Sequence, residues 1–209
     1  MPYRARALLA ALLLSSGAHA STTLNATMTN NQENPPVVPT TATGAPRPAS
    51  FGTATFVIND AMTAMSFQAV VNNIDFTGLQ TLDVNDNLTA AHIHAPAPPG
   101  SNTGVVFGFF GSPFNDNNPN DVVFSPFATG VGGTISAKWD APEGNNTTFA
   151  AQLGNILAGL SYINFHTTQF AGGEIRGQIL PVPEPETYAL MLAGLAVVAS
   201  VARRRKVVH

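Results

Sequence analysis

Residues 21–181 consist of short runs in which apolar and polar side chains alternate, separated by clusters of Gly, Pro, Asn and Asp. Alternation with a period of two is typical of strands that bury one face, and the clusters between them are typical of turns. No long stretch shows the 3.6-residue period of an amphipathic helix. We therefore expect residues 21–181 to form one all-β domain.

The alternating runs predict seven strands and one helical turn. The expected strands are residues 51–58, 65–71, 89–94, 105–110, 134–139, 162–167 and 174–180, and the helical turn is at 155–159. Seven short strands in one domain predict a single antiparallel β-sandwich with Greek-key connections, of the immunoglobulin or superoxide dismutase kind.

The first twenty residues, MPYRARALLAALLLSSGAHA, have the three parts of a secretory signal peptide. Arg4 and Arg6 precede the apolar run 7–14, and the small-residue sequence Ala-His-Ala follows at 18–20. This order is the one in which a positive region, an apolar region and a cleavage site occur. We expect signal peptidase to cleave after Ala20 and the domain to be exported.

A second apolar stretch, residues 188–202, carries no charge and is followed by a basic tail at 203–206. A helix over this stretch is about 22 Å long, and the long basic side chains beyond it close part of the gap to a hydrocarbon core of about 30 Å. Positive residues stay on the cytoplasmic side of a membrane. We expect one transmembrane helix at about 188–202 that anchors an extracytoplasmic domain to the inner membrane.

The residues before this stretch, Val-Pro-Glu-Pro-Glu-Thr at 182–187, complete a three-part C-terminal pattern. The pattern resembles a PEP-CTERM sorting signal, in which Pro183, Glu184 and Pro185 form the motif that an exosortase-type enzyme processes. The resemblance implies a Gram-negative bacterium that makes exopolysaccharide. It also implies delivery of the mature protein to the cell surface or the extracellular matrix.

The segment between the two ends is anionic and has no cysteine. Residues 21–182 hold three cations against ten acids, a net charge of −7. An anionic domain between cationic ends does not hold phosphate backbones by electrostatics, so nucleic acid is excluded as a partner. The absence of cysteine excludes disulfides and thiolate metal sites.

Three histidines in the expected domain are the candidate metal ligands. His92 and His94 lie two residues apart on the expected strand 89–94, so they share one face about 7 Å apart. His166 lies on the expected strand 162–167. If the two strands pair, three imidazoles form a site suited to zinc or copper.

A structural network is the alternative for the same histidines. Neutral imidazoles often only hydrogen-bond backbone or carboxylate groups. Glu174, Arg176 and Gln178 share one face of the expected strand 174–180, and they would complete a Glu–Arg–His network. Neither alternative is settled by the residues alone.

Four blocks in chain order carry a second resemblance. They are residues 24–38 with Glu-Asn-Pro-Pro-Val, Ala-His-Ile-His at 91–94, Tyr-Ile-Asn-Phe-His-Thr at 162–167 and Gly-Gly-Glu-Ile-Arg-Gly-Gln at 172–178. Together they are similar to the CHRD domain, which was first named in chordin and is common in bacterial secreted proteins. The resemblance covers nearly all of residues 21–181 and implies an extracellular β-sandwich whose molecular activity is largely undefined.

Enzymatic signatures are missing from the sequence. It has no Gly-x-Ser-x-Gly, no His-Glu-x-x-His and no phosphate-binding glycine loop, and its acids are too scattered to nominate a glycosidase pair. The His-x-His strand is similar to one in Cu/Zn superoxide dismutase. That enzyme, however, needs more histidine ligands and a disulfide. We expect no catalytic residues, although a weak metal-dependent activity stays open.

We therefore expect a secreted, surface-anchored structural or interaction module of the bacterial envelope or exopolysaccharide matrix. One alternative is an extracellular zinc- or copper-binding domain that uses His92, His94 and His166. Another is a carbohydrate-binding adhesin, for which one Trp and three Tyr supply few aromatic rings. The expected partners are signal peptidase, an exosortase-type enzyme, the membrane, and exopolysaccharide or matrix proteins.

Overall fold

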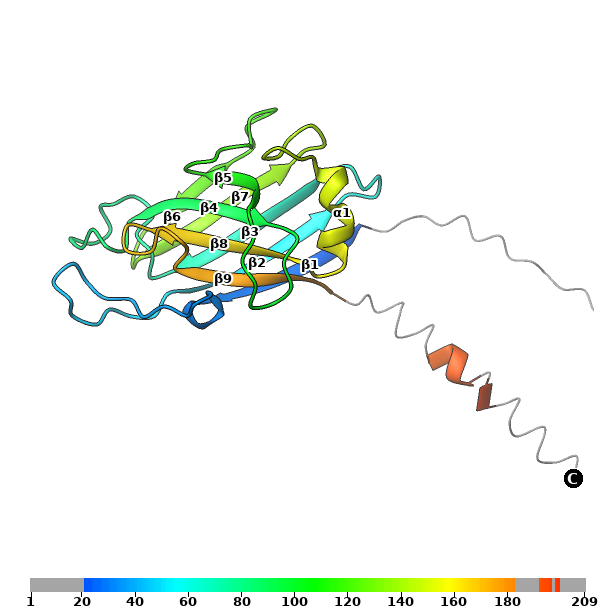
Figure 1. The fold of residues 1–209 in the computed structure, drawn as a ribbon, viewed down its shortest axis with the longest axis horizontal. Coiled ribbons are helices and arrows are strands. Elements are labelled where there is room, and N and C mark those ends of the chain that lie inside the picture. The colour runs from blue at the N-terminus through cyan, green and yellow to red at the C-terminus, as the bar shows by residue number, and fades with distance from the viewer. Residues whose placement is uncertain (1–20, 183–191, 197, 200–209) are drawn as a thin grey trace, which may run out of the picture.

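The computed structural model describes residues 21–182, 192–196 and 198–199. Nine strands and two short helices fill the first of these ranges (Figure 1). The strands are β1 (Thr22–Thr29), β2 (Phe51–Ile58), β3 (Met65–Asn72), β4 (Leu88–His94), β5 (Val105–Phe110), β6 (Val123–Pro126), β7 (Gly132–Trp139), β8 (Ser161–Thr167) and β9 (Ile175–Pro181). The helices are the 3₁₀ turn η1 (Asn30–Gln32) and α1 (Phe149–Leu157).

The nine strands form one antiparallel sheet in the order β5-β4-β8-β9-β1-β2-β3-β7-β6. The expectation of an all-β antiparallel domain is confirmed. The sheet differs from the expected sandwich because β1 pairs with β2 on one side and with β9 on the other, so no break separates two layers. The continuous sheet instead curls until its two halves face each other across the core (Figure 1).

All seven expected strands are present, with bounds that differ by at most two residues. The sequence analysis missed β1, although Leu24, Ala26 and Met28 alternate there and are buried. It also missed β6, which has only four residues and lies at an edge of the sheet. The expected helical turn at 155–159 is the end of the longer helix α1, which begins at the N-cap Thr148.

Aromatic rings fill the space between the two halves of the sheet. Phe67 of β3 packs against Phe109 of β5 with ring centroids 4.8 Å apart. Phe107 of β5 stacks on Trp139 of β7 at 4.9 Å. Helix α1 adds Phe149 to the same cluster, against Trp139. These contacts join strands far apart in the sheet, so burial of apolar surface holds the curled shape.

The two edges of the curled sheet also come together. Phe110 of β5 stacks on Phe124 of β6 with centroids 5.1 Å apart and planes 4° from parallel. All nine strands and the apolar core lie between residues 22 and 181. Residues 21–182, called the mature domain below, therefore contain the whole of this sheet and its core.

The two expected terminal signals fall largely outside the described residues. Ala20 and the sequence Pro183-Glu184-Pro185 lie outside them, as does most of the expected helix at 188–202. None of the helices in the described part of the chain combines the length and apolar character needed to cross a bilayer.

Candidate metal centre

The three histidines lie on the face of β4 and β8 that points away from the apolar core. On β4, Ala91 and Ile93 belong to the core cluster, so the alternate residues His92 and His94 point to the outer face. Strand β8 pairs with β4 so that His92 lies opposite Asn164, and Ala90 lies opposite His166. The expected pairing of the two strands is thus present, and it brings all three imidazoles together.

Loops cover this outer face and bury the histidines. The connection between β4 and β5, residues 95–104, crosses the outer side of β8 and β9 (Figure 1). The exposed fractions of His92, His94 and His166 are only 4%, 7% and 7%. The histidines therefore belong to a polar layer enclosed between the sheet and its covering loops.

The facing nitrogens of the three rings converge on one point. Each histidine offers one ring nitrogen, and these atoms all lie within 4.8 Å of one another. Nδ1 of His92 is 3.0 Å from Nε2 of His166. Ligand nitrogens of a tetrahedral zinc ion are separated by about 3.3 Å, given Zn–N bonds of about 2.05 Å. The His92–His166 separation is therefore close to that of two zinc ligands, and the third nitrogen lies within 4.8 Å of both.

Backbone carbonyls fix which nitrogens carry protons. Nδ1 of His94 lies 2.9 Å from the carbonyl oxygen of Thr103, and Nδ1 of His166 lies 2.8 Å from that of Ala171. A carbonyl only accepts, so both Nδ1 atoms must donate, and in a neutral ring Nε2 then carries a lone pair. Metal-binding histidines are held in place in this way.

Burial keeps the three rings neutral. Burial lowers the pKa of His92 to about 3, with the neighbouring His166 and His94 lowering it further and the backbone of Ser112 opposing the shift. Burial also lowers the pKa of His94 to about 4, against the carbonyl of Thr103. The pKa of His166 is lowered by burial as well. Neutral imidazole is the form that binds metal ions.

Asn164 adds an oxygen to the point where the rings meet. Its Oδ1 is 3.1 Å from Nε2 of His94 and 3.0 Å from Nε2 of His166. An amide oxygen only accepts hydrogen bonds, so it cannot donate to either lone pair. The sequence analysis missed Asn164 as a site residue. It is two residues before His166 and shares its face, which is the signal that could have identified it.

Glu33 is an acid beside this layer, and its carboxyl group is buried. It follows η1 and is 7% exposed, and its Oε1 has no hydrogen-bond partner among the described residues. Burial raises its pKa to about 7, against the lowering effects of Arg176, the Asn34 backbone and the Asn164 amide. A Cβ atom at Gly173 would collide with Glu33 Oε1 and with Asn164 Nδ2, so these two groups crowd the same glycine.

Arg176 belongs to the same layer, but no ion pair within the described part of the chain involves it. Its guanidinium carbon lies 3.6 Å from the centroid of Tyr162, and the Tyr162 ring stacks on His94 at 4.6 Å. It donates to Asn102 and to the carbonyl of Ser101, both in the covering loop. The Glu–Arg–His network considered from the sequence is not formed, because Glu174 turns to a different partner.

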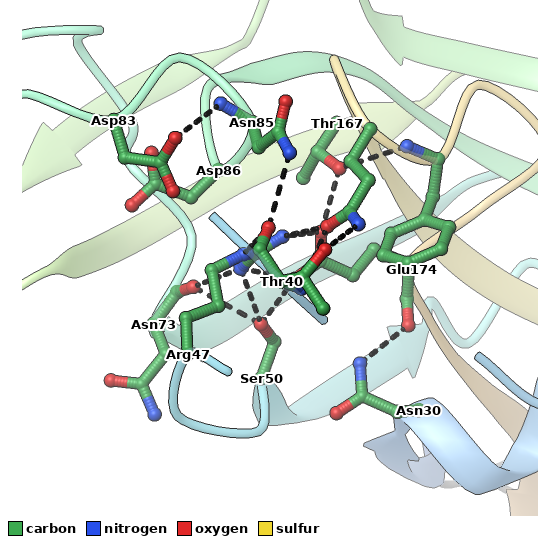
Figure 2. A network of polar contacts seen from close by, with 12 residues as sticks. Asn30, Thr40, Arg47, Ser50, Asn73, Asp83, Asn85, Asp86, Thr167 and Glu174 are labelled. Atoms are coloured by element: carbon green, nitrogen blue, oxygen red, sulfur yellow. Dashed lines mark hydrogen bonds and ion pairs between the residues drawn. The ribbon is translucent and has the colours of Figure 1, made fainter. Parts of the chain in front are cut away.

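That partner is Arg47, in a second buried polar cluster (Figure 2). The Glu174 carboxylate accepts from both terminal nitrogens of Arg47, at 2.8 and 2.5 Å, and from the hydroxyl of Thr167 at 2.6 Å. The hydroxyl of Ser50 donates to it as well. This cluster, called the Arg47–Glu174 network below, ties the loop between β1 and β2 to the end of β8.

Comparisons with known proteins agree with both resemblances. The CHRD domain family matches residues 24–179, and the PEP-CTERM protein-sorting motif matches residues 181–206. No curated protein and no solved structure matches the chain significantly. The sorting motif marks an exported protein that is processed by an exosortase-type enzyme. The chain therefore belongs to the CHRD domain family and carries a PEP-CTERM protein-sorting motif directly after its CHRD domain.

Proposed function

We propose that the mature domain is an extracellular metal-binding domain that holds one zinc or copper ion between His92, His94 and His166. The single observation that carries this proposal is the convergence of the three ring nitrogens with Asn164 Oδ1, in which Nε2 of His94, Nε2 of His166 and this oxygen are all acceptors. A lone pair buried against another lone pair is costly unless a cation lies between them.

Hydrogen bonding within the layer cannot satisfy these acceptors in the arrangement described. One proton on Nδ1 of His92 would serve Nε2 of His166. It would leave Nε2 of His94 facing the Asn164 oxygen with no donor between them. A single metal ion binds all of these atoms at once, and imidazole nitrogen is a good ligand for both zinc and copper.

The burial of the ligands supports a role in holding the metal, with no turnover of a substrate. Catalytic metal sites keep one open position for water or substrate. Here the three histidines are at most 7% exposed. We propose a non-enzymatic domain that acts on the cell surface or in the exopolysaccharide matrix after exosortase-type processing. Sugar binding is less well supported, because Trp139 and Tyr162 are buried and cannot stack on a sugar.

A metal-free structural layer makes a distinct prediction. It requires the Asn164 amide in the reverse orientation, with Nδ2 donating to the imidazoles and Oδ1 accepting from a protonated Glu33. Such a layer would give Nε2 of His94 and Nε2 of His166 a donor and would take up no metal. The two arrangements therefore differ in metal content.

The test is the metal content of the purified mature domain, measured by elemental mass spectrometry before and after incubation with Zn²⁺ or Cu²⁺. We expect about one ion per chain in the wild type and none in His94→Ala. Tyr162→Phe is the matched control, since it keeps the ring stacked on His94 and should retain the ion. A folded wild type that takes up neither ion would overturn the proposal and favour the structural layer.

A further inference from the structure

The histidine centre brings together neutral ligands, and a buried positive charge lies beside it. Three neutral imidazoles and one amide give a bound ion no negative charge. Arg176 is 2% exposed. Its guanidinium lies over the ring of Tyr162, and that ring stacks on His94. A divalent ion placed there would therefore lie near a buried cation, and buried charges of one sign require compensation.

Glu33 is the group placed to compensate. No ion pair of the described residues involves Glu33 or Arg176. The carboxyl of Glu33 meets Asn164 beside Gly173, so the amide of Asn164 lies between this carboxyl and the histidines. Its Oε1 is buried without a hydrogen-bond partner in the described part of the chain. Such an orphaned buried oxygen calls for a physical explanation.

We propose that Glu33 is the counter-charge of the metal centre, and that it makes the centre prefer a divalent ion over a monovalent one. Glu33 acts as a positioning residue and does not bind the ion. Its carboxylate attracts Nδ2 of Asn164, which keeps Oδ1 turned towards the imidazoles, and its negative charge offsets the ion through space. This inference rests on the proposed metal-binding function.

The two parts of the role respond differently to the charge of the ion. Loss of the negative charge reduces the binding free energy of a divalent ion by twice the electrostatic energy that a monovalent ion loses. If the Asn164 amide is no longer held in its orientation, by contrast, the affinities for both ions fall to a similar extent. The ratio of the two affinities therefore isolates the charge from the geometry.

The experiment measures the affinities of the mature domain for Zn²⁺ and for Cu⁺ by competition with chelators of known strength. In Glu33→Gln, which keeps the shape and removes the charge, we expect the preference for Zn²⁺ over Cu⁺ to fall at least about tenfold. Glu33→Asp should restore part of this preference. Glu143→Gln is the matched control, because Glu143 is equally buried but lies among Asn117, Asn118 and Asp140.

The outcomes separate this inference from the proposed function. A wild type that binds neither ion contradicts metal binding itself. A wild type that binds, with an unchanged affinity ratio in Glu33→Gln, overturns the role of Glu33 alone. An equal loss of affinity for both ions would also overturn it, because it would assign Glu33 to orientation only. Thermal unfolding of each variant confirms that the folded domain is being compared.

Discussion

The Arg47–Glu174 network and the histidine centre are both buried polar clusters, yet they differ in how their groups are matched. In the network, one carboxylate accepts from a guanidinium and two hydroxyls, so donors meet an acceptor of opposite charge (Figure 2). In the histidine centre, Nε2 of His94 and Nε2 of His166 face the Asn164 oxygen, acceptor against acceptor, and no ion pair among the described residues involves the nearby buried charges Glu33 and Arg176.

This difference separates a cluster that is complete by itself from one that lacks a component. A satisfied network stabilises the native arrangement and needs nothing from solution. A buried group of acceptors is maintained at a cost, and such sites are characteristic of ligand binding. Three predictions test this contrast between the two clusters, beginning with the largest expected effect.

Removal of one partner from the Arg47–Glu174 network should be strongly destabilising. Glu174→Ala leaves the Arg47 guanidinium buried at 6% exposure without its carboxylate. Breaking a buried ion pair in this way costs about 3–5 kcal/mol of the free energy of unfolding. Urea denaturation of the mature domain measures this loss.

A double variant controls for the unpaired charge. Arg47→Met combined with Glu174→Leu removes both charges, and we expect it to lose clearly less stability than Glu174→Ala, because no ion remains buried alone. Metal uptake should persist in both variants. A loss in Glu174→Ala below about 1 kcal/mol would contradict the contrast drawn here.

The stability of the metal-free domain should fall on acidification because of the histidine centre. The folded pKa values of about 3 for His92 and about 4 for His94 lie below the ordinary value of 6.5. Their contribution is thus complete above pH 6.5 and is lost as the pH falls towards the folded values. When the pH falls from 6.5 to 5, we expect His92 and His94 each to lower the free energy of unfolding by about 2 kcal/mol.

Glu33 opposes this trend but does not cancel it. Its pKa of about 7 is raised from 4.5, so its unfavourable contribution grows as the pH rises from 4.5 to 7. The effect of two histidines on the free energy of unfolding is larger than that of one glutamate, so stability still falls as the pH is lowered. Urea denaturation at pH 6.5 and 5 checks this, and His94→Gln should show a shallower loss. Equal stability at both pH values in the wild type would contradict neutral buried rings.

The smallest effect is expected at an exposed ion pair. Lys138 lies 2.8 Å from Asp140, but its side chain is 42% exposed, in contrast to Arg47. Lys138→Met should change the free energy of unfolding by less than about 1 kcal/mol, and added salt should abolish the difference. A larger effect that does not depend on salt would show that this pair contributes to stability as a buried ion pair does.

The sequence predicted the strands well because alternation is a local signal. It placed His92 and His94 on one face, and it put His166 on a strand that could pair with theirs. The sequence did not predict the features that depend on which distant strands pair. Because β1 pairs with β9, the strands form one sheet where a sandwich was expected. The local alternation of side chains does not determine strand order. Glu33 reaches the centre through the same long-range fold, so its role could not be assigned from its neighbours.

The strand order also makes completion of the sheet depend on the last part of the domain. Strand β1 is the first strand in the chain, whereas its neighbour β9 ends where the sorting motif begins. Pairings between distant strands form slowly, and the sheet cannot be completed until Ile175–Pro181 is available to pair. Until then one edge of β1 is open to other chains and to proteases. A chain that lacks β9 therefore exposes the edge of β1 that is covered in the finished sheet.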